Sequence, residues 1–598
     1  MPHDHGFTED QKQYLSGFIT ALAEKHGNPA PKEAASSEQL ADATGARRQT
    51  DPTIIHIEAQ NRAIAAGGAL PPEELAKRDN HPLDMWDEIA ANAAAARFPK
   101  GLDIFRHKFH GLFYTAPNDD SFMLRLRIPG GILSAHQADG LAEVAERFGR
   151  RCLDLTTRAN VQIRGIGPGH SLGVLEAMAD LGLTSRGAGA DNIRNLTGSA
   201  TAGIDPQELI DTRPLTRALH HHILNHRELY GLPRKFNIAF DGGGRLAVLE
   251  DTNDIGFAAV QVATGKPVPP GIYFRMLLGG VTGHETFARD SGVLLAPHEA
   301  VPAAVAIVRV FIDHGDRTDR KKARLKYLID RWGMRKLLDE AARHLPFPWR
   351  SAPAEWCEPR GPIDKHGHIG VHPQAQPGRC YVGVVLPAGR LQAPQVRGLA
   401  DIARRRGSGT LRLTVWQNLL ISDIPEGDIP DAVAEIEAVG LAAAASAVRG
   451  GLVACTGNAG CRFARADTKR DALALAEHLD SRIGIDQPIN IHLTGCPNSC
   501  AQHYVGDIGL LATRIDPGGD AEEIEGYQIS VGGGSGPELA LGRPLYDAVA
   551  VEELPQRLEV MLRSYLAHRR PQESFHAFAN RHSVEALLAM FGADGGSA

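Results

Sequence analysis

Two pairs of cysteines in the C-terminal part of the chain could bind a metal centre. Cys455 and Cys461 are separated by five residues and Cys496 and Cys500 by three, so four thiols fall within 46 residues. Four thiolates suit a tetrahedral zinc ion or a [4Fe–4S] cluster. A five-residue gap is unusual for a zinc knuckle, and the Gly and Asn residues around the pairs are typical of loops whose N–H groups point at cluster sulfurs. The spacing favours a cluster, with zinc or unligated buried thiols as alternatives.

A second group of residues could bind an anion. Between Leu155 and Ile166 the even positions are polar, whereas Val161 and Ile163 are apolar. In a single strand this alternation would place all the even positions on one face. These positions are Thr156, Arg158, Asn160, Gln162 and Arg164. We therefore predict an anion-binding face.

Two further segments carry basic residues at strand spacing. In Phe122–Ile128 the apolar residues alternate with Arg125 and Arg127, for which a solvated strand face is the alternative explanation. In FNIAFDGGGRLAVLE the glycine run predicts the turn of a β-hairpin. Lys235 and Asn237 would then point to the same side of its first strand.

The chain contains an internal repeat. An offset of 258 positions aligns 36 residues from Ile128 with 36 from Leu386 without a gap, and about 16 of them are identical. The second copy has Trp416, Leu420 and Ser422 where the first has Arg158, Gln162 and Arg164, so only the first copy keeps the anion-binding face. We predict an N-terminal helical extension (1–100), a first repeat (101–345), a Pro-rich connector (346–376) and a second repeat (377–598).

Composition limits the possible functions. The net charge is −7, so no general basic excess exists to bind a nucleic-acid backbone. The start has no signal-peptide pattern and no segment has about 18 uninterrupted apolar residues, which predicts a cytoplasmic protein without a membrane span. An odd number of cysteines, seven, argues against a disulfide scaffold. No dinucleotide or flavin motif occurs, so we expect electrons to come from another protein.

Several motifs together resemble the siroheme-dependent nitrite and sulfite reductases. They are the C-x₅-C…C-x₃-C pair, TGCPNSCAQH, MLRLRIPGG, LTTRANVQIR, DNIRN and LPRKFNIAF, and the resemblance spans residues from about 105 to 570. It implies an α+β (mixed α/β) fold of two repeated halves around siroheme and a [4Fe–4S] cluster. It also implies a six-electron reduction of nitrite to ammonia, with reduced ferredoxin or a similar small carrier as the donor.

The resemblance also implies roles for individual residues. Cys455, Cys461, Cys496 and Cys500 would hold the cluster, with Cys500 bridging it to the siroheme iron. Arg125, Arg194 and Lys235 would bind the substrate anion. Thr156, Arg158, Gln162, Arg164, Arg234 and Arg324 would bind the siroheme carboxylates, which require paired cations when buried.

Asn237 carries the choice of substrate. The family's sulfite reductases commonly have a second lysine at this position and its nitrite reductases an asparagine, and one cation fewer suits a monoanion. Nitrite is therefore the predicted substrate, and sulfite, reduced to sulfide, is the main alternative. Siroheme chemistry on a tetrapyrrole precursor and a non-catalytic iron–sulfur sensor are weaker alternatives.

An acidic ferredoxin would need a local basic patch for docking. The two candidates are Arg404–Arg406 and the segment from Arg317 to Lys326, although three consecutive arginines can also be a solvated helix end. His220–His222 with His226, and the remaining cysteines Cys152, Cys357 and Cys380, are predicted to be structural.

Overall fold

Helices form the described part of the N-terminal segment. The computed structural model describes residues 54–516, 518 and 522–593, so residues 1–53 of the predicted extension lie outside it. Helices α3 (Ile54–Ala65), α4 (Pro72–Asp79) and α5 (Trp86–Ala94) follow. On α4 the buried Glu74 is paired with Lys77 and, at 2.7 Å, with Arg317. These buried ion pairs attach α4 to the body of the protein.

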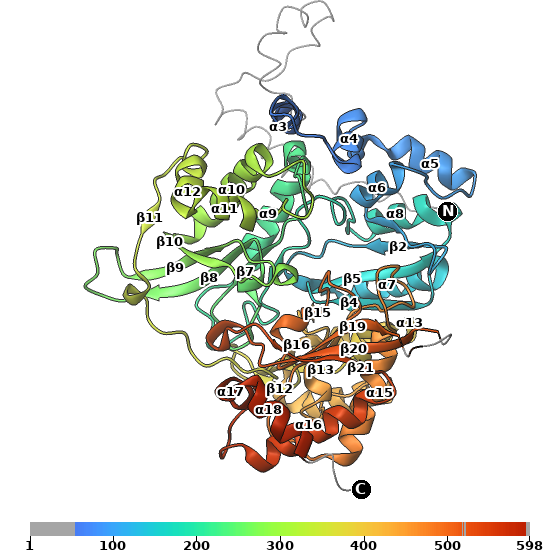
Figure 1. Cartoon of the computed structure of the whole chain (residues 1–598), viewed down its shortest axis with the longest axis vertical. Coiled ribbons are helices and arrows are strands. Elements are labelled where there is room, and N and C mark those ends of the chain that lie inside the picture. The colour runs from blue at the N-terminus through green and yellow to red at the C-terminus, as the bar shows by residue number, and fades with distance from the viewer. Residues whose placement is uncertain (1–53, 517, 519–521, 594–598) are drawn as a thin grey trace, which may run out of the picture. The chain divides into compact units, whose positions relative to one another are not determined.

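Two of the five-stranded sheets (Figure 1) are each completed by one strand from the other copy of the repeat. The first sheet has the order β1 (Leu112–Tyr114), β2 (Phe122–Arg125), β5 (Asn160–Ile166), β4 (Cys152–Thr156) and β14 (Arg390–Gln392). The second has the order β12 (Gly370–Pro373), β13 (Arg379–Val384), β16 (Leu419–Pro425), β15 (Thr410–Leu413) and β3 (Ile132–Ser134). Thus β3 and β14 are exchanged between the copies.

The pairing of the two exchanged strands has the same register in both sheets. Ser134 pairs with Thr410, and the equivalent Gln392 pairs with Cys152, each 258 residues from its counterpart. Helices α7 (Ala135–Phe148) and α13 (Ala393–Arg406) follow the exchanged strands, and each begins with a capping box. Side chains from both copies form one hydrophobic core. The copies therefore bury their apolar faces against each other.

The other two sheets also repeat each other. The first has the order β11 (Arg350–Ser351), β10 (Arg289–Leu295), β9 (Gly271–Leu278), β8 (Ile255–Val262), β7 (Ile238–Asp241) and β6 (Thr197–Gly198). The second has the order β17 (Leu452–Ala454), β18 (Ile491–Thr494), β19 (Ile508–Ile515), β20 (Ile524–Val531) and β21 (Arg543–Ala550). In both, three parallel strands are followed by antiparallel ones.

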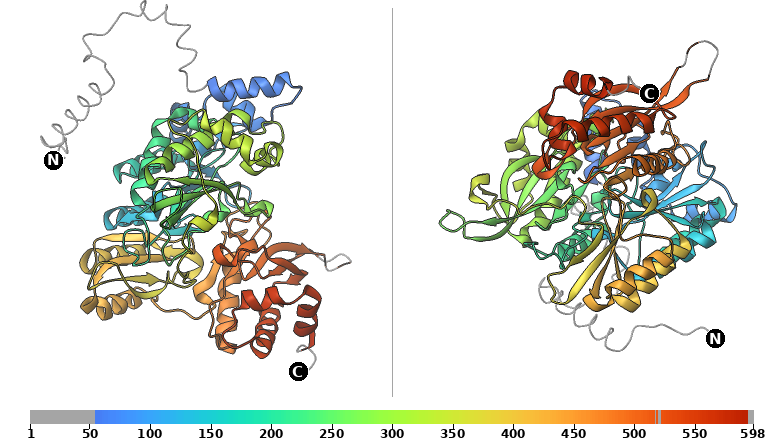
Figure 2. Two further views of the ribbon diagram at one scale, coloured as in Figure 1. Left: turned by 90° about the vertical axis from the view of Figure 1, so that its left-hand side faces the viewer. Right: turned by 90° about the horizontal axis from the view of Figure 1, so that it is seen from below.

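Helices cover the four sheets (Figures 1 and 2). They are α6 (Asp103–His107), α8 (Ser171–Asp180), α9 (Arg213–Asn225), α10 (Ala300–His314), α11 (Leu325–Trp332), α12 (Met334–Ala342), α14 (Ile429–Ala438), α15 (Thr468–Arg482), α16 (Leu554–His568), α17 (Phe575–Arg581) and α18 (Val584–Ala593). Among the described residues, none of the helices combines the length and apolar character needed to cross a bilayer. The predicted mixed α/β fold with two repeated halves is confirmed.

Three local predictions differ from the structure. The predicted hairpin after Asp241 is wrong, because β7 and β8 pair in parallel and their connection must return the chain to the same end of the sheet. Residues 155–166 form two antiparallel strands, β4 and β5, rather than one. The segment predicted as a connector contributes β11 and β12 to two sheets.

The exchanged strands should make both copies unfold together. Leu133 on β3 and Leu391 on β14 are almost fully buried in the shared core. Replacing either by Ala should cost about 2–5 kcal/mol and lower the melting temperature of one common transition in calorimetry. Leu75→Ala, at a position that is 47% exposed, should have little effect. Two separate transitions, of which each core variant moves only one, would contradict the prediction.

Candidate functional site

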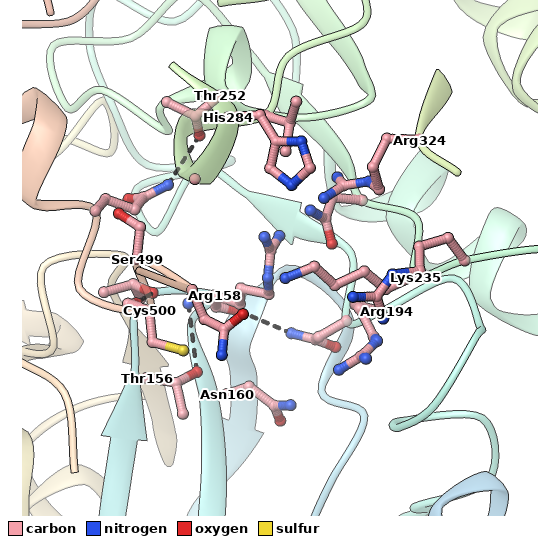
Figure 3. Close-up of a pocket in the computed structure, with 18 of the residues that line it drawn as sticks. Thr156, Arg158, Asn160, Arg194, Lys235, Thr252, His284, Arg324, Ser499 and Cys500 are labelled. Atoms are coloured by element: carbon pink, nitrogen blue, oxygen red, sulfur yellow. Dashed lines mark hydrogen bonds between the residues drawn. The ribbon is translucent and has the colours of Figure 1, made fainter. Parts of the chain in front are cut away.

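Basic side chains converge on a cavity at the centre of the described chain. We call it the cationic cavity; about 1110 Å³ of space, part of it open to solvent, lies between its lining residues. Its basic lining residues are Arg125, Arg158, Arg194, Arg234, Lys235 and Arg324. Figure 3 shows Arg158, Arg194 and Lys235 reaching toward the space beside the Cys500 thiol. The site is therefore large and strongly positive.

Four of these cations have no carboxylate partner within 4.0 Å among the described residues. Arg158 donates to the Asn253 side-chain oxygen at 3.2 Å and Arg194 to the Ala190 carbonyl at 2.7 Å, while Arg125 lies over the Phe113 ring. The Lys235 side chain makes neither a hydrogen bond nor a contact with an aromatic ring in the described chain. Uncompensated buried cations are costly, so this arrangement requires an anionic ligand.

Burial affects the protonation of these groups. It lowers the pKa of Arg125 and of Arg158 to about 10 and that of Arg194 well below its usual value. Burial, with the nearby Arg324 and Arg194 charges, lowers the pKa of Lys235 to about 7. Lys235 can therefore exchange a proton near neutral pH.

Two other lining arginines are already paired. The Arg324 guanidinium donates to both oxygens of Asp254, at 2.7 and 3.3 Å, and Arg234 lies 3.9 Å from Asp191. Asp254 also accepts a hydrogen bond from the Asn237 backbone N–H at 2.8 Å. Arg324 therefore holds the strand that presents Asn237, in addition to lining the cavity.

The β4–β5 hairpin positions most of the predicted anion-binding face. Thr156 and Asn160 are paired across the turn, so the even positions on both strands keep one orientation although the chain reverses. Arg158 lies in the turn itself, where Ala159 has a positive φ of 46°. Arg164 points to the neighbouring cavity and donates to the Gly460 carbonyl at 2.9 Å.

The four paired cysteines surround that neighbouring cavity, which we call the cysteine cavity. The Gly495 N–H donates to Cys455 Sγ at 3.1 Å, and the Asn498 amide lies 3.5 Å from Cys496 Sγ. Burial and the neighbouring thiols raise the pKa of Cys496 to about 11. As thiolates these groups would need a bound cation, and the N–H donors suit cluster sulfurs.

The spacing of the sulfur atoms discriminates between zinc and a cluster. Two sulfurs on one zinc ion are at most about 4.6 Å apart, because the Zn–S distance is about 2.3 Å. Within residues 54–516, 518 and 522–593, the one group of three or more ligand atoms within 4.8 Å of one another is Asp507, Glu538 and His576. No three of the four thiols in the described chain meet this limit, so their arrangement does not match a tetrahedral zinc site. In that group, the Lys365 ammonium already neutralises the carboxylates: it lies 3.1 Å from Asp507 and 2.7 Å from Glu538.

Cys500 lines both cavities, whereas Cys455, Cys461 and Cys496 line the cysteine cavity alone. Its side chain is exposed to this shared space. Thr156, Gln162 and Arg125 also line both cavities. A group in the cationic cavity would thus meet a group in the cysteine cavity at the Cys500 thiol.

All the site residues predicted from the sequence line one or both cavities, and the structure adds others. The additional lining residues include Asn195, His284, Ser499 and Gln502. Asn195 and Gln502 belong to the DNIRN and TGCPNSCAQH motifs, which could have identified them. His284 follows no such motif; burial and the charges of Arg324 and Lys235 lower its pKa to about 4, so it is a neutral donor or acceptor.

Comparisons with known proteins agree with this geometry. The model of the nitrite and sulphite reductase 4Fe-4S domain matches residues 189–348 and 446–594, and that of the nitrite/sulfite reductase ferredoxin-like half domain matches 114–181 and 372–439. The ferredoxin–nitrite reductase of Synechococcus elongatus is 36% identical over 512 residues, or 84% of this chain and 98% of that protein. The one from Leptolyngbya laminosa is 37% identical over 474 residues, or 78% and 90%.

A solved structure supports the same assignment. The NirA protein of Mycobacterium tuberculosis superposes with a TM-score of 0.80 at 30% identity, covering 88% of this chain and 99% of that one. The family implies siroheme and a [4Fe–4S] cluster as cofactors, and both fit: a cavity lined by six basic side chains for a polycarboxylate, and four thiols around a neighbouring cavity for a cluster. The predicted resemblance is confirmed, and the chain is an oxidoreductase that belongs to the nitrite and sulfite reductase family.

Proposed function

We propose that this protein reduces nitrite to ammonia in a six-electron reaction, with electrons from reduced ferredoxin or a similar small carrier. Relatives that are 36 and 37% identical are named ferredoxin–nitrite reductases, which supports this substrate and donor. We place the reaction in the cytoplasm, where seven free cysteines stay reduced. Sulfite remains the alternative substrate.

The observation that carries the proposal is the position of Cys500 between the two cavities. We assign the four thiols of the cysteine cavity to the cluster and Cys500 to the bridge toward siroheme. When bound, the two cofactors would supply electron storage and a Lewis-acidic iron for the reduction. Thr156, Arg158, Gln162, Arg164, Arg234 and Arg324 would hold the siroheme carboxylates.

The protein's own groups would bind and protonate the substrate anion. Arg125 and Arg194 present guanidinium groups without carboxylate partners. They can therefore stabilise the negative charge of nitrite and of its oxygen atoms, which leave as water. Lys235 has a pKa of about 7, so its Nζ can donate a proton and be reprotonated between electron transfers. Removing one of these groups should weaken reduction of either anion.

The function is tested on purified holoenzyme with a dithionite-reduced dye. Nitrite should be turned over with a higher kcat/KM than sulfite, and ammonia should account for the nitrite consumed. Cys500→Ser should lose turnover and the coupled siroheme spectrum together. Cys152→Ser, at a thiol outside both cavities, should keep both. A preference for sulfite, or equal loss in the two variants, would refute the proposal.

The repeat supplies a control for the role of Asn237. Asn490 is its counterpart in the second copy: its N–H donates to Asp507 at 2.7 Å, as that of Asn237 does to Asp254, but it lines neither cavity. Asn237→Lys adds a cation at the cationic cavity, so the ratio of sulfite to nitrite kcat/KM should rise at least several-fold. Asn490→Lys should reduce stability without changing this ratio. A ratio unchanged by Asn237→Lys would remove Asn237 from the determinants of specificity.

The structure changes the expected docking site of the electron carrier. Arg404, Arg405 and Arg406 are all engaged by acidic groups: Asp139, Asp401, Asp431 and Glu435. In the Arg317–Lys326 segment, Arg317 is buried against Glu74, and Arg324 against Asp254. Arg404–Arg406 are therefore neutralised, whereas in the second patch Lys321 and Lys322 are exposed and have no ion pair among the described residues.

The loop after Cys461 offers a better docking surface. Phe463 is 55% exposed and lines the cysteine cavity with Arg462, whose guanidinium lies over its ring. Arg462 and the exposed Arg465 have no ion pair among the described residues. These features combine positive charge and an aromatic contact beside the cysteine cavity, which suits an acidic electron carrier.

Charge reversal distinguishes these docking surfaces. Arg465→Glu should raise the KM for reduced ferredoxin several-fold and weaken its dependence on ionic strength, while dye-driven nitrite reduction stays near the wild-type rate. Arg404→Glu is the matched control and should change neither KM. A larger effect of the Arg404 variant, or equal loss with ferredoxin and dye, would contradict docking at Arg465.

A further inference from the structure

A buried lysine, Lys469, lines the cysteine cavity without a role in the function proposed above. It lies in the first turn of α15 and is only 6% exposed. Its Nζ donates to the Ala388 carbonyl and lies 3.9 Å from an oxygen of Asp154. An ammonium group has three donors, so this single hydrogen bond leaves capacity directed at the cavity.

Asp154 does not by itself explain the burial of Lys469. The Asp154 carboxylate accepts from Arg390 Nε and Nη2 at 2.8 and 3.0 Å, and Arg164 Nε lies at 3.3 Å. Burial opposes ionisation, but Lys469 and Arg390 outweigh it and hold the pKa of Asp154 at about 2. Two arginines already neutralise this one carboxylate, and Lys469 adds further positive charge. The network therefore has a surplus of cations beside the four thiols.

The same helical turn contacts a cysteine directly. The Thr468 hydroxyl donates to the Cys455 carbonyl at 2.8 Å and lies 3.4 Å from Cys455 Sγ. The positive end of the α15 dipole thus lies at the same wall of the cavity as Lys469. Both features favour negative charge inside the cavity.

We propose that Lys469 is a fixed positive charge that stabilises the reduced state of the [4Fe–4S] cluster and thereby raises its reduction potential. Reduction adds one electron, and so one negative charge, to a buried centre. A cation at the wall of a low-dielectric cavity attracts that charge more strongly than it would across water. Lys469 acts on the cluster through space, so it is a tuning residue and not a ligand. The inference rests on the cluster assignment within the proposed function.

The test is an EPR-monitored redox titration of the holoenzyme without nitrite or sulfite. Lys469→Gln removes the charge but can still donate to the Ala388 carbonyl, so the midpoint potential of the cluster should shift to a lower value. Lys469→Arg should keep it near the wild-type value. Asp154→Asn, which removes the negative charge of the network, should shift the potential in the opposite direction.

Specific outcomes would overturn the proposal. An unchanged potential in Lys469→Gln would do so, as would loss of siroheme absorption with the cluster potential unaltered, because Lys469 would then serve a siroheme carboxylate. If Lys469→Gln does not assemble a cluster, Asp154→Asn decides: a raised potential supports the proposal and an unchanged one refutes it. Because no substrate is present, a wrong choice between nitrite and sulfite leaves this result unaffected.

Discussion

The burial of unpaired cations around one cavity is the constraint on which the rest of the site depends. Acidic groups close to the cavities are already engaged: Asp254 by Arg324, Asp154 by Arg390, and Asp191 by Arg320 at 2.8 Å. The lining cations Arg125, Arg158, Arg194 and Lys235 are left without a counter-ion among the described residues. A chain with a net charge of −7 thus keeps a positive interior. Anionic cofactors and substrate would offset the free-energy cost of burying these cations without a counter-ion.

The repeat shows how one scaffold supports two different interiors. Both copies use a hairpin with a left-handed residue in its turn, Ala159 in the first and Gln417 in the second. In the first copy this turn presents Arg158 to the cavity. In the second, Trp416 takes that position and is buried against His368, and the Gln417 amide donates to the Leu155 and Ala454 carbonyls. The backbone geometry is retained, and only the first copy has a surface for anions.

Local sequence patterns predicted the residues of the site better than they predicted the topology of the sheets. The Cys455–Cys500 spacing and the even-numbered polar positions identified residues that do line the cavities, the latter because a turn of three residues preserves strand parity. The parallel pairing of β7 and β8 could not be read from a glycine run that resembles a hairpin turn. The neutralisation of Arg404–Arg406 by Glu435 and other acids depends on helix packing, which periodicity does not reveal.

Strand exchange and the cofactor site depend on the same segment of chain. Residues 388–392 form a turn and strand β14, which supplies Arg390 opposite Asp154 and the Ala388 carbonyl that anchors Lys469. At the equivalent position of the other sheet, Ile132 faces Arg412, whose guanidinium donates to the Ala200 and Ala202 carbonyls. There the buried charge is satisfied by backbone carbonyls and the Ser422 hydroxyl, without a carboxylate. Of the two exchanged strands, β14 alone brings a carboxylate and surplus cations to the cysteine cavity, so the contact that joins the two copies also sets the charge around that cavity.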